Sequence, residues 1–309
     1  MLSLYIHIPF CARKCEYCSF FVLPEEEIKK QDSEDHGKMR PLEEIKEAYL
    51  EALLAENMAW KGRYPEEQVR TIYIGGGTPF QLGRERLLKL IDTLLETWGV
   101  ETLEELTIEL NPDPMDETIA FIKECGNRYP QLYRLRFSIG IQSFDDEILK
   151  ESKRAYTFAE LQDYFRALVQ VKKPHIDYNF DFIAFGKFRK DERGAEHLRD
   201  HERLVFFKKI IDSHIADGFS LYTLELFPGS TRYYKQKVEG KETENLSTKS
   251  KKVHRLQNND DAIYQEFDIL STYITRGGYR RFELSNYAML SKASIHNMVY
   301  RTMQPYIGM

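Results

Sequence analysis

The sequence predicts an α/β protein built around a parallel β-sheet. Short β-rich segments alternate with amphipathic helical segments about six times between Leu2 and Leu226. Such an alternation favours a parallel sheet whose strands are joined by crossover helices. Periodicity alone does not choose between an open doubly wound sheet and a barrel, so both architectures stay open at this point.

Six segments have the composition of strands. They are rich in Ile, Tyr, Phe and Leu, and most are bounded by Gly, Pro or Asn. The predicted strands are 2–8, 71–74, 106–110, 133–139, 176–183 and 219–226. Apolar residues at helical spacing predict helices between them. These helices lie near 42–53, 87–98, 157–168 and 204–215, and Thr157 with Glu160 has the spacing of a capping box.

The chain divides into a core and a shorter carboxyl-terminal part. The strand–helix pattern stops after Leu226, and a polar, lysine-rich stretch follows. Such a stretch is typical of a solvated loop or linker. We therefore predict a core at 1–232, a charged linker at 233–258 and a further region at 259–309 that begins a carboxyl-terminal domain.

Four smaller segments complete the predicted organisation. In the last region, a helix is expected near 260–274 and a strand near 279–284. Two charged insertions, 24–40 and 187–202, are expected to be mobile surface loops.

Composition limits the class of protein. Hydrophobic residues make up 42%, enough for a sizeable core, and 30% charged residues suit an ordinary soluble surface. The net charge of −5 argues against a nucleic-acid partner, because such proteins usually carry a basic excess. No apolar stretch approaches the ~18 residues of a membrane span, and no targeting segment is visible. We therefore expect a cytoplasmic protein with reduced thiols.

Three of the four cysteines crowd into eight residues directly after the first predicted strand. Cys11, Cys15 and Cys18 form a C-x3-C-x2-C pattern. Three thiolates on one tight loop suit an iron–sulfur cluster and leave one iron open for another ligand. The alternative is structural zinc, for which Cys125 or His7 would supply the fourth ligand. Zinc is disfavoured, since the usual paired C-x2-C spacing is absent.

The cysteine segment resembles a known signature. Tyr5-Ile-His-Ile-Pro-Phe-Cys11 followed by Cys15-Glu-Tyr-Cys18-Ser-Phe20 is similar to the radical S-adenosylmethionine (SAM) motif of oxygen-independent coproporphyrinogen III oxidases (HemN) and HemW heme chaperones. The serine after the third cysteine follows the HemW-like form. The resemblance implies a partial (β/α)6 TIM-like barrel with a short α+β extension. It also implies a [4Fe–4S] cluster on the three cysteines, with SAM on the open iron and Tyr5 and Tyr17 beside the cofactors.

A glycine-rich segment ends the second predicted strand. Gly75-Gly76-Gly77-Thr78-Pro79 lets a ligand approach the backbone closely, and exposed N–H groups there can meet a carboxylate. By itself such a segment is as often a tight turn as a binding site. The resemblance implies that Gly76, Gly77 and Thr78 bind the methionyl part of SAM.

Four further side chains follow the same pattern. Glu109, Gln142, Arg154 and Asp181 fall at or just past the ends of successive predicted strands. Each residue alone is ambiguous, but ligands bind at the carboxyl ends of strands both in barrels and in open α/β sheets. The resemblance implies that all four contact SAM.

The carboxyl-terminal part also resembles HemW, with departures. Segment 283–288 and His296-Asn297 match a HemW-like stretch, in which a histidine could ligate heme iron; an ordinary hydrogen-bonded histidine is about equally expected. Arg301 stands where HemW-like proteins have Trp, and Ala184 begins a segment that departs from the usual G-L-P. The sequence ends at Met309, where the family continues into a helical domain, so we expect a truncated form.

The resemblance implies three functions. The first is SAM-dependent oxidative decarboxylation of porphyrinogen propionates, an oxidoreductase activity. The second is a HemW-like heme chaperone that binds heme and SAM without oxidase activity, and the third is a radical SAM methyltransferase. The implied partners are a tetrapyrrole, either porphyrinogen or heme, and a reduced flavodoxin or ferredoxin-type electron donor. No residue is assigned to substrate choice or to catalysis.

Overall fold

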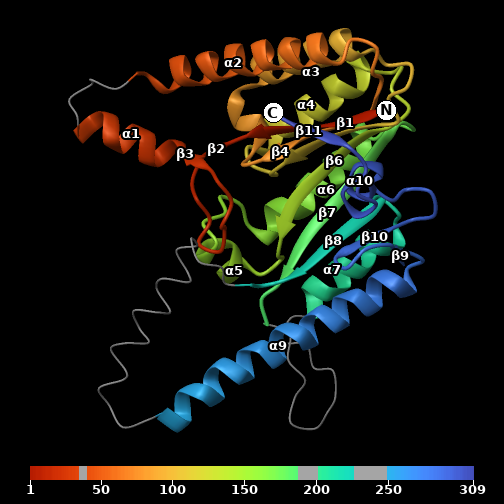
Figure 1. Cartoon of the computed structure of the whole chain (residues 1–309). Coiled ribbons are helices and arrows are strands. Elements are labelled where there is room, and N and C mark those ends of the chain that lie inside the picture. Colours follow the sequence, from red (N-terminus) through yellow and green to blue (C-terminus); the bar gives the residue numbers. More distant parts are fainter. Residues whose placement is uncertain (35–39, 187–200, 226–248) are drawn as a thin grey trace.

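The computed structural model describes residues 1–34, 40–186, 201–225 and 249–309 (Figure 1). The strands are β1 (Leu2–Ile8), β2 (Phe10–Cys11), β3 (Leu23–Pro24), β4 (Val69–Gly76), β5 (Glu105–Leu110), β6 (Leu135–Gln142), β7 (Ile176–Ala184), β8 (Gly218–Thr223), β9 (Arg280–Arg281), β10 (Asn286–Ala288) and β11 (Tyr306–Gly308). The α-helices are α1 (Glu25–Glu34), α2 (Leu42–Arg63), α3 (Arg84–Trp98), α4 (Met115–Arg128), α5 (Asp146–Glu151), α6 (Phe158–Val171), α7 (His201–Asp212), α9 (Lys249–Arg276) and α10 (Ile295–Arg301), and a 3₁₀ turn, η1, covers Pro79–Leu82.

The strand order distinguishes between the two predicted architectures. Strands β1, β4, β5, β6, β7 and β8 are neighbours in that order, and every pair is parallel. A doubly wound sheet reverses its strand order at a switch point. Here each crossover moves to the next strand in the same direction, which places the helices on one face, as in a (β/α) barrel. Figure 1 shows α2, α3 and α4 together beyond β1 and β4, and α9 beyond β8. The predicted α/β fold with a parallel, barrel-like sheet is confirmed.

The two faces of the sheet differ in polarity. On β6, Leu135, Phe137 and Ile139 belong to the hydrophobic core, whereas Arg136 and Ser138 line a cavity. Alternate residues of a strand lie on opposite faces, so the apolar set packs under the helices and the polar set faces inward. Parallel strands that are covered on both faces read as nearly continuous hydrophobic runs. The alternation seen here therefore indicates an interior that accommodates polar groups.

The carboxyl-terminal segment joins both edges of this sheet. Strand β10 pairs antiparallel with β8 at one edge, and β11 pairs parallel with β1 at the other. Helix α10 lies between them in the chain and crosses the amino-terminal ends of the strands. There the N–H groups of Ile295 and His296 donate to the Glu105 carboxylate at the start of β5, at 2.9 and 3.1 Å. This segment closes the end of the barrel opposite the carboxyl ends of the strands.

Some local predictions need correction. Segment 24–40 is not simply a loop, because residues 25–34 form α1. Its first turn carries Glu25, Glu26 and Glu27, which suit the positive end of a helix dipole, and Glu25 pairs with Lys46 of α2 at 2.7 Å. The strand expected at 279–284 is only Arg280–Arg281, since the chain turns sharply into β10.

Other predictions fall partly outside the described residues. Residues 187–200 of the second predicted loop lie outside them, as do residues 226–248, which include most of the predicted linker. Helix α9 begins at residue 249, inside the predicted linker range, so its last part is helical. The domain division itself stays a prediction. Among the described helices, none combines the length and apolar character that crossing a lipid bilayer requires.

Candidate functional site

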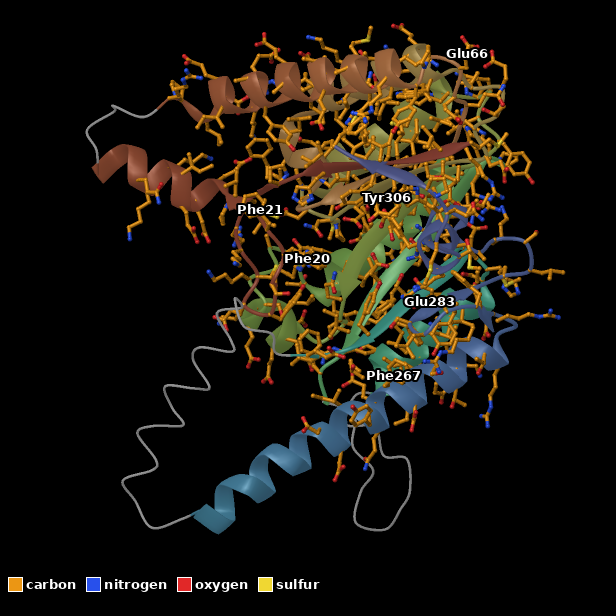
Figure 2. The ribbon with its side chains drawn as sticks, viewed as in Figure 1. Phe20, Phe21, Glu66, Phe267, Glu283 and Tyr306 are labelled. Carbon is orange, nitrogen blue, oxygen red and sulfur yellow. The ribbon has the colours of Figure 1, made fainter. Side chains whose placement is uncertain are left out.

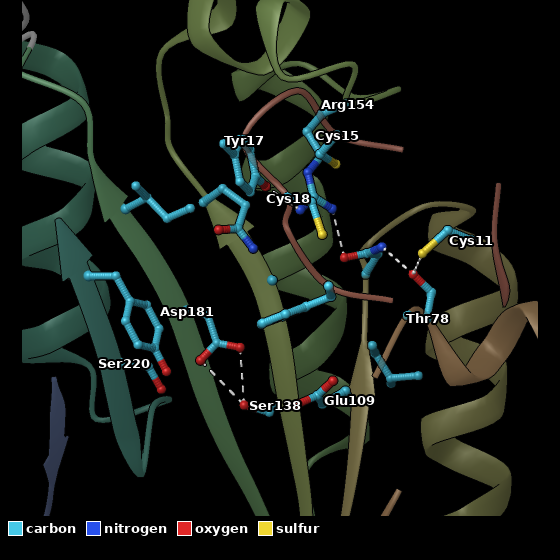
Figure 3. Close-up of a pocket in the computed structure, with 18 of the residues that line it drawn as sticks. Cys11, Cys15, Tyr17, Cys18, Thr78, Glu109, Ser138, Arg154, Asp181 and Ser220 are labelled. Carbon is cyan, nitrogen blue, oxygen red and sulfur yellow. Dashed lines mark hydrogen bonds between the residues drawn. The ribbon is translucent and has the colours of Figure 1, made fainter. Parts of the chain in front are cut away.

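A cavity of about 850 Å³ lies at the carboxyl ends of the parallel strands. Its wall combines the cysteine loop (residues 11–20) with strand ends from β4 to β8 (Figure 3). The sequence-predicted residues that line it are Cys11, Cys15, Tyr17, Cys18, Gly76, Gly77, Thr78, Glu109, Gln142, Arg154 and Asp181. Tyr5 and His296 lie elsewhere. The fold therefore brings residues from six separate segments of the chain to one site.

The three thiols of the cysteine loop face this cavity. Burial raises the pKa of Cys11 to about 11, partly offset by a 3.6 Å contact with the Thr78 hydroxyl, and burial also raises the pKa of Cys18. A bound cation would favour the thiolates instead. Among the described residues, no three His, Cys, Asp or Glu side chains converge closely enough to hold a single metal ion. Spaced thiols on one loop fit a cubane cluster, which distributes its ligands over separate irons.

A chain of hydrogen bonds connects the cysteine loop to the strand ends. The Arg154 guanidinium donates to the Tyr17 hydroxyl at 2.8 Å and to the side-chain Oδ1 of Asn111 at 2.7 Å. The Asn111 amide donates to Thr78 at 2.9 Å, and Thr78 contacts Cys11 (Figure 3). The Arg154 Nε is buried and has no partner among the described residues. An unsatisfied cationic donor beside the thiols fits a ligand with an acceptor group there.

The glycine-rich segment packs against the chain's own groups. The N–H of Gly76 donates to the Glu109 carboxylate at 3.1 Å, and the N–H groups of Gly77 and Thr78 donate to backbone carbonyls of residues 8 and 10, both at 2.8 Å. Gly76 has φ +112°, and a Cβ there would lie 2.5 Å from the His7 ring. The expectation of exposed N–H groups is therefore wrong. Contact of these residues with SAM stays a prediction.

Two carboxyl groups lie on the floor of the cavity. Figure 3 shows Glu109 and Asp181 on either side of Ser138. Burial raises the pKa of Glu109 to about 7, opposed by a 2.5 Å hydrogen bond from the Tyr73 hydroxyl. Burial also raises the pKa of Asp181, which accepts from Ser138 at 3.1 Å. Glu109 can therefore hold or release a proton near neutral pH.

The backbone at Gln142, the last residue of β6, is irregular. It has φ +69°, a left-handed conformation that is uncommon for residues other than glycine, and the pairing of β6 with β7 is irregular there. A Cβ at Gly140 would lie 2.7 Å from the Gln142 amide nitrogen, so a larger residue there would displace the end of the Gln142 side chain. Such strain is typical of functional sites.

The two predicted residues outside the cavity have partners elsewhere. The Tyr5 hydroxyl lies 3.2 Å from the His7 ring, and burial raises the pKa of Tyr5 to about 12. His296 is fully buried; its Nδ1 lies 2.7 Å from the Thr71 hydroxyl and its Nε2 lies 2.8 Å from the Tyr300 hydroxyl. Heme ligation by His296 stays a prediction, and it would require one of these bonds to break.

Sequence reasoning missed several residues that line the cavity. They are Tyr73, Asn111, Arg136, Ser138, Ser220 and Tyr222. The signal was present in the strands themselves. In segment 135–139, for example, apolar and polar residues alternate strictly, which distinguishes a ligand-lined interior from a sheet covered on both faces.

Comparisons with known proteins agree with this geometry. The radical SAM superfamily profile matches residues 5–201. The heme chaperone HemW of Buchnera aphidicola subsp. Schizaphis graminum is 28% identical across 99% of this chain and 68% of its own length. HemW of Bacillus subtilis is 27% identical across 100% and 69%.

A solved structure has a similar fold. Coproporphyrinogen III oxidase (HemN) from Escherichia coli, described as a radical SAM enzyme, superposes with a TM-score of 0.64 at 19% identity. The match covers 100% of this chain and 63% of that one. At this identity the likeness establishes the fold alone, and the chain spans less than two thirds of that enzyme's length.

Proposed function

Because this chain belongs to the radical SAM superfamily, we propose that it carries a [4Fe–4S] cluster and SAM at the cysteine loop and binds heme as a chaperone. The observation that carries the proposal is the convergence of three thiols on one loop with Arg154, whose buried Nε has no partner among the described residues. This is the combination that a cluster and an anionic cofactor group require.

Each residue has a proposed role. Cys11, Cys15 and Cys18 hold the cluster, and Arg154 both orients the cysteine loop through Tyr17 and offers its Nε to SAM. When bound, the cluster and SAM together supply a one-electron cleavage that creates a carbon radical. The remaining SAM contacts are proposed for Gly76, Gly77, Thr78, Glu109, Gln142 and Asp181, with Tyr5 in a supporting position behind them.

Heme is the favoured tetrapyrrole. The HemW relatives are heme chaperones that align along 99–100% of this chain. In addition, the cavity mouth carries exposed apolar side chains suited to a macrocycle face: Phe20 is 66% exposed and Leu284 is 74% exposed, and both line the cavity. Phe20 on the cysteine loop and Phe267 on α9, both labelled in Figure 2, also line the cavity. A flat apolar ligand can pack between these surfaces.

The cofactor part is tested by anaerobic reconstitution. Wild-type chain is expected to bind about four irons and to show the absorption of a [4Fe–4S] cluster that changes when SAM is added. The Cys15→Ala variant is expected to lose both signals. Cys125, a buried residue of α4 that does not line the cavity, provides the matched control Cys125→Ala, which should retain them. Equal loss in both variants, or retained zinc in place of iron, would contradict the proposal.

The heme part is tested by titrating the reconstituted chain with ferric heme and following the Soret band. Saturable binding at one heme per chain supports the chaperone function. Unsaturable, nonspecific binding contradicts it.

The second candidate is SAM-dependent oxidative decarboxylation of a porphyrinogen. The observation in its favour is that the cavity continues from the cysteine loop down to the polar interior of the barrel, where a substrate side chain would lie close to SAM. A reduced flavodoxin or ferredoxin-type protein is the proposed electron donor. Incubation with reductant, SAM and coproporphyrinogen III distinguishes the two: a vinyl-bearing product would replace the chaperone proposal, and intact substrate with saturable heme binding would retain it.

A further inference from the structure

Arg136 is a buried cation that the chain itself leaves without a partner. It lies on the inner face of β6, is 4% exposed and lines the floor of the cavity. Among the described residues, none forms a hydrogen bond or an ion pair with its guanidinium. A guanidinium carries five N–H donors, and those of Arg136 face the cavity rather than an acceptor of the chain. Such a group at the floor of a cavity indicates a ligand that supplies the missing hydrogen-bond acceptors.

The cations at the amino-terminal end of the barrel, the buried Arg134 and the partly exposed Lys292, are paired, in contrast. Arg134, two residues earlier, pairs with Asp177 at 3.0 Å and Glu105 at 3.3 Å, and donates to the Ala293 carbonyl at 2.9 Å. Lys292 pairs with Asp177 at 2.5 Å. The chain therefore has the means to satisfy a buried cation within the barrel, but it does not do so one layer higher, where the cavity begins.

The acids near Arg136 do not take up its donors. Burial raises the pKa of Glu109 and Asp181, and the positive charge of Arg136 counteracts this effect from a distance. Both carboxylates are held by other donors of the chain, Glu109 by Tyr73 and Asp181 by Ser138. No hydrogen bond or ion pair joins either carboxylate to the Arg136 guanidinium among the described residues. Its planar N–H donors therefore remain open to a bidentate acceptor, and a carboxylate has the matching geometry.

We infer that Arg136 binds a propionate carboxylate of the tetrapyrrole at the floor of the cavity. Arg136 precedes Gly140 by four residues of β6, which places its Cα roughly 13 Å deeper along the strand. Every residue proposed for SAM lies above Arg136: Gln142 and Arg154 lie beside the cysteine loop. Glu109 and Asp181 lie lower, but they pair in register with Ser138 and Gly140, two and four residues beyond Arg136 on β6. The anion at Arg136 therefore comes from a second molecule. The inference rests on the proposed function, because heme and porphyrinogens both bring propionates.

The test compares ferric heme with ferric heme dimethyl ester, whose propionates are uncharged. Wild-type chain, reconstituted with its cluster, is expected to bind heme about 10- to 100-fold more tightly than the diester. In Arg136→Gln the affinity for heme falls to that for the diester, which itself does not change. Arg136→Lys keeps the charge but not the fork, so its affinity for heme should be intermediate. Arg63→Gln, at an exposed position of α2, is the matched control and should behave as wild type.

Each other result has a distinct meaning. Equal wild-type affinity for heme and diester overturns this inference and leaves the proposed function standing, as does an equal loss of both ligands in Arg136→Gln. If Arg136→Gln weakens SAM binding and leaves heme binding unchanged, then Arg136 binds the carboxylate of SAM, and the inference is overturned. If neither tetrapyrrole binds saturably, both the inference and the proposed function are overturned. If Arg136→Gln does not fold, the wild-type comparison of heme with its diester still decides.

Discussion

At the amino-terminal end of the barrel the buried charged side chains form ion pairs with one another, whereas at the carboxyl-terminal end two arginine side chains that line the cavity keep N–H donors without an acceptor among the described residues. Glu105, Arg134 and Asp177 form ion pairs beneath α10, and all three are buried. Above them, the buried Nε of Arg154 has no hydrogen-bond partner among the described residues, and Arg136 faces the cavity without an ion pair to any described residue. Since both ends lie in one sheet, the difference separates groups that stabilise the fold from groups that await a ligand.

Two buried groups, one at each end, also respond to pH in opposite directions. Burial lowers the pKa of His296 to about 4 at the amino-terminal end and raises that of Glu109 to about 7 at the carboxyl-terminal end. The unfolded chain titrates these groups near their ordinary values, about 6.5 and 4.3. Stability from His296 is thus lost as the pH falls, and stability from protonated Glu109 is lost as the pH rises. The two contributions to the pH dependence of stability partly cancel in the wild type, so single-residue variants are needed to separate them.

The largest expected effect is at the amino-terminal end. Glu105→Gln should lower the free energy of unfolding by about 3–5 kcal/mol, because it removes one of the two carboxylates that pair with the buried Arg134 and weakens the acceptor for the α10 N–H groups. Urea unfolding measures it. Glu104→Gln, one residue away in a partly exposed pair with Arg70, should cost no more than about 1 kcal/mol. Equal costs would mean that the paired network contributes no special stability.

The next effect is the pH response of His296. Between pH 7 and pH 5 the unfolded chain binds a proton that the folded chain excludes, so the wild type should lose about 2 kcal/mol of stability through this group. His296→Asn should remove that part of the pH dependence. The exposed His214 gives the control His214→Asn, which should retain it. An unchanged slope in His296→Asn would contradict the low pKa.

A smaller effect of opposite sign is expected for Glu109. The folded chain holds a proton that the unfolded chain releases above its ordinary pKa, so stability should fall as the pH rises from about 4.5 to 7. Allowing for its partial exposure to the cavity, we expect about 1 kcal/mol. Glu109→Gln should abolish this component in urea unfolding series at several pH values. If the slope of Glu109→Gln matches that of wild type, the carboxyl group titrates normally.

The smallest effect is expected at the cysteine loop. Tyr17→Phe removes the hydrogen bond from Arg154, and the chain without cofactors should lose only about 1 kcal/mol of unfolding free energy. Tyr133→Phe, at an exposed position, should cost nothing measurable. A loss of 3 kcal/mol or more in Tyr17→Phe would contradict the contrast between the two ends, since the polar groups of the carboxyl-terminal end would then contribute as much to the free energy of unfolding as those of the amino-terminal end.

The sequence by itself determined the features that depend on short segments of the chain. Alternating strand and helix segments predicted the α/β fold, and the Thr157–Glu160 spacing predicted a capping box that the structure contains at the start of α6. The cysteine spacing and the placement of Glu109 and Asp181 at strand ends predicted which residues meet at the cavity. These predictions succeed because parallel strands in sequence order bring their carboxyl ends together whatever the details of packing.

Only the tertiary structure decided the roles that depend on distant neighbours. His296 stands beside Thr71, 225 residues away in sequence, and this contact makes it a buried hydrogen-bonded residue of the barrel's closed end. Likewise, Arg134 and Arg136 have the same residue type and strand face, yet one is paired and the other is not. The physical reason is that burial, pairing and pKa depend on groups that folding brings from other segments, and local spacing carries no record of them.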